Sequence, residues 1–196
     1  MDIGKYLSNK KNIIDKALDE LLPSVEEYPN LIHKAMRYSI FSGGKRIRPI
    51  LVIASAEVVG GYTDDIIPIA CGIEAIHTYS LIHDDLPSLD NDDYRRGKLS
   101  NHKKFGEETA ILAGDALLTF AFEIFSRSDN IAPANDILQM VHEVAKYCGT
   151  RGMIGGQMVD LKSEGKIIDA KTLNFIHNNK TGALIVASVR TGAICS

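Results

Sequence analysis

Helical periodicity runs through almost the whole sequence and limits the fold more than any other feature. Ile137, Val141, Val144 and Cys148 are spaced by four, three and four residues, which places them on one face of a helix. The same kind of spacing recurs in residues 110–124. Because no alternation of apolar and polar residues is long enough for a sheet, the pattern predicts an all-α fold.

The expected helix ends and the overall composition indicate one globular domain. Pro29 and Pro133 stand where helices are expected to begin, because proline suits the first helical turn. With 196 residues, of which 45% are hydrophobic and 24% charged, the chain can bury one sizeable core. We therefore predict a single α-helical domain over residues 1–196. A net charge of -3 without a basic stripe gives no indication of a nucleic-acid binder.

The apolar stretches and the cysteines predict a cytoplasmic protein. Residues 1–15 mix charged and apolar positions and do not contain the apolar run of a signal peptide. The most apolar stretch, residues 49–56, is far too short to cross a bilayer, so we expect no membrane span. Cys71, Cys148 and Cys195 are widely spaced among small or apolar neighbours, which is typical of reduced, buried thiols.

An acidic segment, residues 84–97, follows a long apolar helix. Pro87 disfavours helical geometry at the residue before it, so this helix should stop close to Asp85. Carboxylates there lie at the negative end of the helix dipole, which destabilises the helix end. A bound cation would offset this unfavourable interaction. Asp84 and Asp90 are the candidate ligands of Mg²⁺, which usually takes one or two carboxylates together with waters and substrate phosphates. A solvated acidic loop is the alternative.

Two basic groups accompany the acidic segment. Arg95 and Arg96 come directly after its aspartates and offer forked donors that match phosphate oxygens. In GGKRIRP, residues 43–49, the cations Lys45, Arg46 and Arg48 follow two glycines that let the backbone approach a ligand closely. Several cations at a helix entry suit a diphosphate, and a basic turn between helices is the alternative. The chain contains no GxxxxGK[ST] nucleotide-binding loop.

The segment HNNKTGAL, residues 177–184, predicts an interrupted helix. Thr181 and Gly182 can bend a helix by disturbing its backbone ladder, which would expose a hydroxyl and carbonyl groups to a pocket. A plain helix is the alternative for this segment. His77 stands seven residues before Asp84, and this spacing places both on one helix face, so His77 joins the candidate site.

Taken in order, these segments resemble the bacterial farnesyl diphosphate synthases (geranyltranstransferases) of the trans-prenyltransferase family. The resemblance covers about residues 35–193 and rests on the ordered set of motifs. The segments that carry it are AMRYSIFSGGKRIRP, IEAIHTYSLIHDDLPSLDNDDYRRG, FGEETAILAGDALLTFAF, GGQMVDL and HNNKTGAL. The resemblance implies the isoprenoid synthase fold, a helical bundle around a deep central pocket, and a homodimer.

Residue by residue, the resemblance implies two diphosphate sites and a metal site. The implied ligands of isopentenyl diphosphate are Lys45, Arg48, His77 and Arg96. Asp84 and Asp90 resemble the Mg²⁺ ligands of the first aspartate-rich motif, and Arg95 resembles a contact to the allylic diphosphate. Lys180 and Thr181 resemble the catalytic pair that binds the allylic diphosphate and faces the developing carbocation.

The implied reaction joins isopentenyl diphosphate to dimethylallyl or geranyl diphosphate and gives farnesyl diphosphate. Mg²⁺ would assist ionisation of the allylic substrate. Product length is inferred from Tyr79, five residues before Asp84, which resembles the pocket floor of farnesyl diphosphate synthases. Pro87 and Ser88 occupy the two-residue insertion of the bacterial motif. A small residue in place of Tyr79 would indicate the longer geranylgeranyl product.

The second aspartate-rich motif of the family, DDxxD, does not occur in this sequence. We therefore expect the chain to be the N-terminal part of a longer prenyl synthase domain, without its C-terminal helices and part of its metal site. Three alternatives stay open: a geranylgeranyl diphosphate synthase, a non-catalytic partner subunit of a prenyl synthase, and an isoprenoid cyclase. The intact cations and aspartates speak against a non-catalytic subunit. GGKRIRP and His77 speak against a cyclase, which needs no second diphosphate site.

Overall fold

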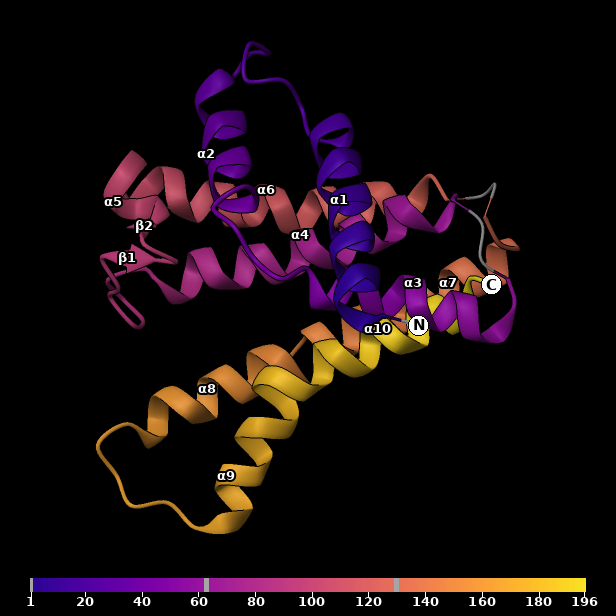
Figure 1. Cartoon of the computed structure of the whole chain (residues 1–196). Helices are drawn as coiled ribbons and strands as arrows, with labels where there is room; N and C mark the ends of the chain where they lie inside the picture. The colour runs from indigo at the N-terminus through magenta and orange to yellow at the C-terminus, as the bar shows by residue number, and fades with distance from the viewer. Residues whose placement is uncertain (1, 62–63, 129–130) are drawn as a thin grey trace. The chain divides into compact units, whose positions relative to one another are not determined.

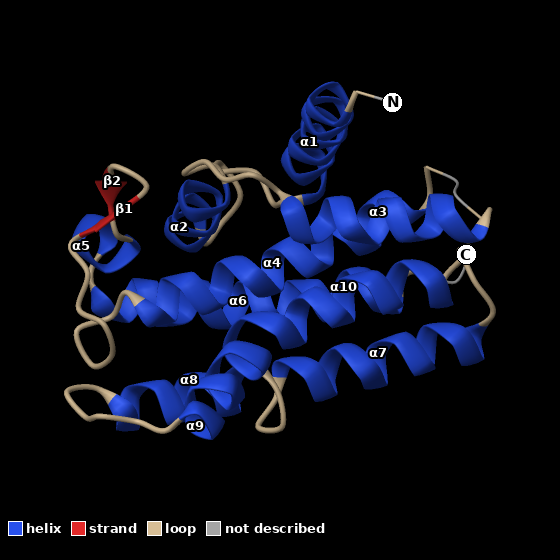
Figure 2. Ribbon diagram, turned by 60° about the horizontal axis from the view of Figure 1, so that its bottom comes forward, coloured by secondary structure: helices blue, strands red, loops and turns tan. Residues whose placement is uncertain are grey.

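The computed structural model describes residues 2–61, 64–128 and 131–196, and confirms the predicted all-α fold. In chain order the elements are α1 (Ile3–Leu21), α2 (Asn30–Ile40), α3 (Ile47–Val59), α4 (Ile66–Asp84), β1 (Tyr94–Arg95), β2 (Lys98–Leu99), α5 (Asn101–Phe105), α6 (Glu107–Ser126), α7 (Ala134–Cys148), α8 (Met153–Ser163), α9 (Ala170–Ile176), the π-helix η1 (His177–Gly182) and α10 (Ala183–Ile194) (Figures 1 and 2). The sequence pattern missed the hairpin β1–β2, whose strands pair antiparallel with Tyr94 opposite Leu99.

The helix boundaries follow the signals in the sequence. Pro29 and Pro133 occupy the N-cap positions of α2 and α7, as predicted. Asp2 and Asp169 accept hydrogen bonds from the backbone amides of Lys5 and Thr172, which satisfies first-turn donors of α1 and α9. Because these ends are capped by local chemistry, the helices begin at residues that can be read from the sequence.

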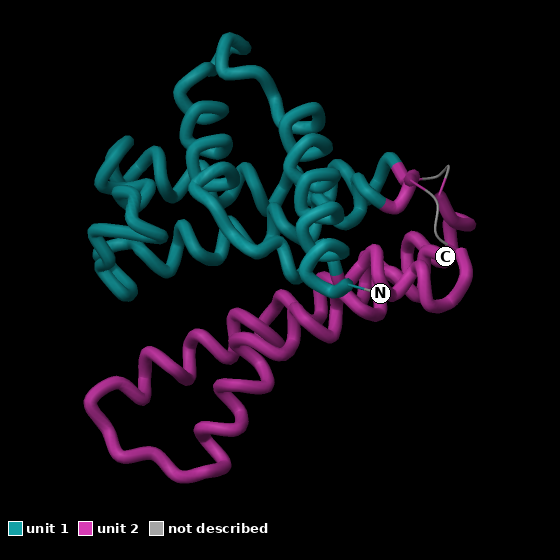
Figure 3. Tube along the Cα trace, in the orientation of Figure 1, with its two compact units in different colours: residues 1–50, 67–127 teal, residues 51–66, 128–196 magenta. Residues whose placement is uncertain are grey.

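The described chain divides into two compact units (Figure 3). The first unit consists of Met1–Ile50 and Ile67–Arg127, and the second of Leu51–Ile66 and Ser128–Ser196. The first unit carries the turn before α3, nearly all of α4, the acidic segment and the hairpin. The second carries α7, α8, α9, η1 and α10. The single domain expected from the sequence remains a prediction.

Helix α4 forms the core of the first unit. Its residues Ile69, Ile73 and Ile76 have no exposed surface, and Glu74 is only 2% exposed although it carries a carboxylate. A helix that is apolar around most of its circumference has to be buried. His83, near its C-terminal end, lies with Nε2 3.0 Å from the Ile111 carbonyl and so links α4 to α6. The buried helix therefore presents its last turns next to fixed neighbours.

Two helices, α4 and α6, are long and apolar enough to cross a membrane by length and composition alone. In α4, 72% of the most apolar window is buried inside the protein. In α6 the corresponding share is 39%, and α2 and α5 pack against this helix. Much of the apolar surface of α4 and part of that of α6 is therefore covered within the protein.

The second unit pairs α7 with α10 and α8 with η1. Glu143 of α7 and Arg190 of α10 form an ion pair. Cys148 and Cys195 are buried free thiols of this unit, as Cys71 is of the first, which confirms that part of the prediction. Burial raises the pKa of Cys71 and Cys148 to about 12 and that of Cys195 to about 11. None of these thiols is an activated nucleophile, because reactivity needs the thiolate.

Candidate active site

The turn between α2 and α3 carries the basic motif and has an unusual backbone. Gly43 and Gly44 have φ values of 109° and 136°, in the region that favours glycine. A Cβ on Gly44 would lie 2.7 Å from Nη1 of Arg96, so the guanidinium lies directly against this glycine. Arg96 also donates a hydrogen bond to the Gly43 carbonyl. The turn and the hairpin are therefore joined in space although they are far apart in the sequence.

A cavity of about 660 Å³ opens beside this turn. Residues 42–48 form one side of it, and Glu74, His77 and Arg96 complete its lining. The structure therefore brings together the four residues that the sequence assigned to isopentenyl diphosphate, namely Lys45, Arg48, His77 and Arg96. Permanent cations gathered around one cavity concentrate positive potential and attract a multiply charged anion.

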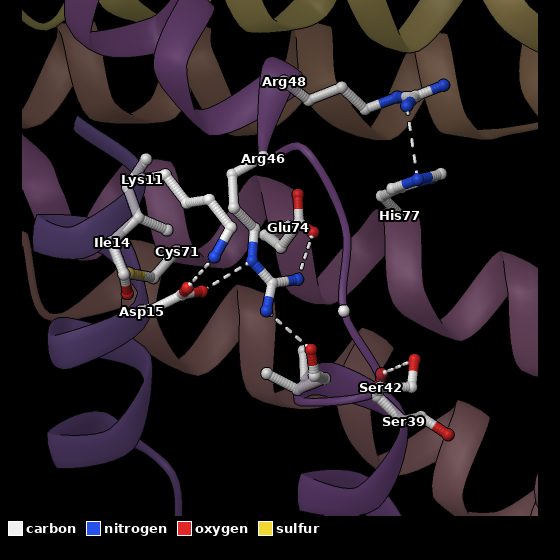
Figure 4. Close-up of polar contacts among 12 residues, drawn as sticks. Lys11, Ile14, Asp15, Ser39, Ser42, Arg46, Arg48, Cys71, Glu74 and His77 are labelled. Carbon is white, nitrogen blue, oxygen red and sulfur yellow. Dashed lines mark hydrogen bonds and ion pairs between the residues drawn. The ribbon is translucent and has the colours of Figure 1, made fainter. Parts of the chain in front are cut away.

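Arg48 and His77 form a hydrogen-bonded pair in the cavity lining. Nη1 of Arg48 donates to Nε2 of His77 over 3.2 Å (Figure 4). Because a guanidinium has no acceptor, Nε2 must be unprotonated, and the ring proton is assigned to Nδ1. Burial lowers the pKa of His77 to about 3, and Arg48 and Arg96 add to the effect. His77 is therefore neutral near pH 7 and accepts from Arg48 instead of repelling it.

Arg48 is incompletely satisfied within the described residues. Burial lowers the pKa of Arg48, although Glu74 opposes this effect. Its Nε is buried and has no hydrogen-bond partner in the described part of the chain. A buried donor left without an acceptor costs roughly 1–3 kcal/mol. Arg48 also lines the cavity, which makes its guanidinium a candidate donor to an anion that enters.

The acidic end of α4 contains an ion pair that the sequence analysis did not assign. The helix ends at Asp84, within one residue of the predicted position. Asp85 is buried, and Nε of Arg95 lies 2.7 and 2.8 Å from its two carboxylate oxygens. Burial raises the pKa of Asp85, while Arg95 opposes the rise. Arg95, assigned from the resemblance to the allylic diphosphate, is thus held against a carboxylate at the edge of the acidic segment.

The two candidate metal ligands lie where the loop folds back onto the helix end. The backbone amide of Asp90 donates to the Asp84 carbonyl over 2.9 Å. Asp84 is half-buried and Asp90 is exposed. Within residues 2–61, 64–128 and 131–196, no three His, Cys, Asp or Glu side chains are placed to hold a metal together. One half-buried and one exposed carboxylate fit Mg²⁺, which takes one or two carboxylates, keeps several waters and binds substrate phosphates.

Lys180 and Thr181 lie in the second unit, in η1. The predicted interruption of the helix at Thr181 and Gly182 is confirmed, because the backbone there is a π-helix. A Cβ on Gly156 would lie 2.1 Å from the Lys180 amide nitrogen, so α8 packs directly on the backbone of η1. Nζ of Lys180 lies 2.5 Å from Oδ2 of Asp160. Single π-helical turns occur frequently at functional sites.

Gln157 of α8 is a residue that the sequence analysis left without a role. Its Oε1 and Nε2 are both buried and have no hydrogen-bond partner among the described residues. Buried polar atoms of this kind are rare in native structures, and each calls for a partner such as a ligand or water. The signal in the sequence was a polar amide within the otherwise apolar motif GGQMVDL.

The comparisons with known proteins support the family and the fold. Residues 29–196 match the polyprenyl synthetase family, and the chain belongs to this family. It is 50% identical to a dimethylallyltranstransferase from Fischerella ambigua over 98% of this chain and 56% of that protein. It is 45% identical to a farnesyl diphosphate synthase from Geobacillus stearothermophilus over 99% of this chain and 65% of that protein.

The solved structures support the same fold. An FPP/GFPP synthase from Zymomonas mobilis in its apo form matches with a TM-score of 0.90 at 38% identity. The match covers 97% of this chain and 70% of that one. Other curated relatives are described as geranylgeranyl diphosphate synthases, so the relatives include both farnesyl and geranylgeranyl diphosphate synthases. The chain spans about half to two thirds of the length of the curated relatives that it matches.

Proposed function

We propose that this chain belongs to a trans-prenyltransferase that condenses isopentenyl diphosphate with dimethylallyl or geranyl diphosphate to give farnesyl diphosphate. The cavity lined by Lys45, Arg48, His77 and Arg96 carries this proposal, because its three cationic side chains offer donors to a diphosphate. Membership of the polyprenyl synthetase family supports the same reaction class. We further propose a cytoplasmic homodimer, as the resemblance implies.

In this proposal the cationic cavity holds isopentenyl diphosphate. Lys45 and Arg96 contribute charge at the exposed rim, and Arg48 contributes forked donors from a half-buried position. Neutral His77 keeps the Arg48 guanidinium oriented through Nε2. Fixing the diphosphate in this way holds the double bond of the same substrate at a defined place, which favours attack on an allylic partner.

The allylic diphosphate is proposed to bind at the acidic end of α4. Asp84 and Asp90 would hold Mg²⁺ there, and the ion would neutralise the departing diphosphate. The allylic C–O bond breaks, the isopentenyl double bond forms the new C–C bond, and loss of a proton restores a double bond. Lys180 and Thr181 are proposed to face the allylic diphosphate and the developing cation.

The farnesyl product is proposed from Tyr79. This side chain is 6% exposed in α4, and its ring meets the ring of His83 edge-on with centroids 5.7 Å apart. A large, fixed ring five residues before Asp84 would limit the length of a growing chain. A geranylgeranyl diphosphate synthase is the second candidate, favoured by the names of several relatives.

A product assay tests the proposal. Isopentenyl and geranyl diphosphates are supplied with Mg²⁺, and the dephosphorylated products are separated by chain length. We expect a fifteen-carbon product, whereas a twenty-carbon product would assign the second candidate. Absence of elongation together with absence of isopentenyl diphosphate binding would contradict prenyl transfer altogether.

A further inference from the structure

Arg46 stands between two candidate substrate ligands, Lys45 and Arg48, but its side chain is directed into the protein interior. It is 4% exposed, and its φ of 52° is unusual for a residue other than glycine. Such a backbone conformation persists where surrounding contacts enforce it. Arg46 therefore needs an explanation different from that of the cations beside it.

Each of the three guanidinium nitrogens of Arg46 donates one hydrogen bond within the protein (Figure 4). Nε donates to Oδ1 of Asp15 over 2.8 Å, and Nη1 donates to Oε1 of Glu74 over 2.7 Å. Nη2 donates to the Ile40 carbonyl over 2.6 Å. Nζ of Lys11 donates to the other carboxylate oxygen of Asp15, Oδ2, over 2.5 Å. The turn is thus fastened to α1, to the end of α2 and to the middle of α4.

The contact with Glu74 relates the turn to the rest of the cavity. Glu74 lies three residues before His77 on α4, so the two side chains belong to neighbouring positions on one helix face. The helix that orients His77 is therefore the same helix that holds Arg46. Fixing Arg46 on Glu74 sets the distance from which Arg48 reaches His77.

The network around Arg46 contains two carboxylates, which are not the groups expected where an anion is to be attracted. Burial opposes the charge of Arg46, but Glu74 and Asp15 outweigh it and hold the pKa of Arg46 above its usual value. Glu74 lines the cavity together with the cations Lys45, Arg48 and Arg96, and burial raises the pKa of its carboxyl while Arg46 opposes the rise. Asp15 contacts Arg46 from α1. Two nearby negative charges weaken the attraction of a diphosphate. Their presence is explained if geometry matters more than local charge.

We propose that Arg46, held by Asp15 and Glu74, is a positioning residue that directs Lys45 and Arg48 into the diphosphate cavity. This inference rests on the proposed binding of a diphosphate in that cavity. In this proposal Arg46, which also belongs to the cavity wall, acts through its neighbours and not as a donor to the ligand. Its bonds to Asp15, Glu74 and Ile40 hold the backbone from which Lys45 and Arg48 extend.

The sign of a charge effect tests the proposal. Binding of inorganic diphosphate and of isopentenyl diphosphate to the 196-residue chain is measured by calorimetry for the parent, Glu74→Gln and Asp15→Asn. Each substitution removes one negative charge near the cavity, so an account based on charge alone predicts tighter binding. Positioning predicts weaker binding by about tenfold, as is common when supporting partners of a ligand are lost.

A matched control removes a charge from the same helix without touching the turn. Asp19 of α1 pairs with Arg37 and has a side chain that is 64% exposed. Asp19→Asn should bind diphosphate as the parent does or slightly more tightly. Circular dichroism and thermal unfolding establish that each variant is folded. If Glu74→Gln does not fold, the binding measured for Asp15→Asn decides between the two accounts, because the Asp15 side chain is 28% exposed and its substitution is better tolerated.

The outcomes separate this inference from the proposed function. If the parent binds and Lys45→Ala binds more weakly, the diphosphate site stands. Equal or tighter binding by folded Asp15→Asn and Glu74→Gln would then overturn the positioning role of Arg46. If the parent binds neither probe, the diphosphate site itself is wrong, and the positioning role is overturned with it.

Discussion

Arg48 donates to Nε2 of His77 over 3.2 Å, and this bond fixes the charge state of the candidate isopentenyl diphosphate site. A protonated His77 would place a second positive charge against Arg48 in a buried position. The pKa of His77 is therefore lowered to about 3, with burial as the largest cause. The cavity gains one permanent cation and one neutral acceptor from this pair.

Stability should depend on pH through His77. Its folded pKa lies below the ordinary value of 6.5, so between pH 6.5 and 3 the unfolded chain binds a proton that the folded chain does not. The contribution of His77 to the free energy of unfolding is therefore fully present above pH 6.5. It is lost as pH decreases, by at most about 1.4 kcal/mol per pH unit. Urea unfolding at pH 7 and pH 5 measures the difference. The drop should shrink in His77→Asn, and an NMR titration of His77 near pH 6.5 would refute this explanation.

Arg48→Lys should weaken diphosphate binding although it keeps the charge. A lysine ammonium is a point charge and does not reproduce the forked donors that reach both His77 and an anionic oxygen. We expect a loss of about tenfold in affinity, corresponding to about 1.4 kcal/mol, with little change in thermal stability. Calorimetric titration with isopentenyl diphosphate measures it. Unchanged affinity would mean that only the charge of Arg48 matters.

Tyr79→Ala should lengthen the product. Removing the ring would open the wall that this account places at the end of the growing chain. Chromatography of dephosphorylated products should shift from fifteen carbons toward twenty or more. Tyr79→Phe keeps the ring and serves as the control, with the parent product expected. An unchanged product pattern in Tyr79→Ala would remove Tyr79 from the pocket floor.

Gly156→Ala should destabilise the second unit, whereas Gly182→Ala should be tolerated. The added methyl on Gly156 would lie 2.1 Å from the Lys180 amide nitrogen, and a backbone atom cannot move aside cheaply. We expect a loss of about 3 kcal/mol of unfolding free energy, at the upper end for overpacking. At Gly182 the nearest contact is 3.4 Å, so the change should stay within about 1 kcal/mol. Chemical unfolding of both variants measures the contrast, and equal effects would contradict direct packing of α8 on η1.

Local signals in the sequence were enough for much of the fold. Pro29, Pro133 and Pro87 act on the backbone within a residue or two, so the ends of three helices could be predicted. A shared site for Lys45 and His77 was inferred from the family resemblance, and the structure places both residues in the lining of one cavity. Spacing alone would have related His77 only to Asp84, because both lie on one helix.

Other features could not be read from the sequence because they depend on partners far along the chain. Asp85 and Arg95 are ten residues apart and pair only after the loop folds back. Glu74 and Asp15 meet Arg46 across separations of 28 and 31 residues. A lone carboxylate in the apolar helix α4 was the signal for Glu74. It identifies a buried charge but not the residue that neutralises it.

The most direct test of the account is calorimetric titration of the chain with isopentenyl diphosphate in the presence of EDTA. The account assigns this substrate to the cationic cavity and assigns Mg²⁺ to Asp84 and Asp90 for the other diphosphate. It predicts binding at one site without metal, lost in Lys45→Ala and retained in Asp84→Asn. Binding that requires Mg²⁺ and disappears in Asp84→Asn, while Lys45→Ala binds normally, would contradict the assignment of the cavity.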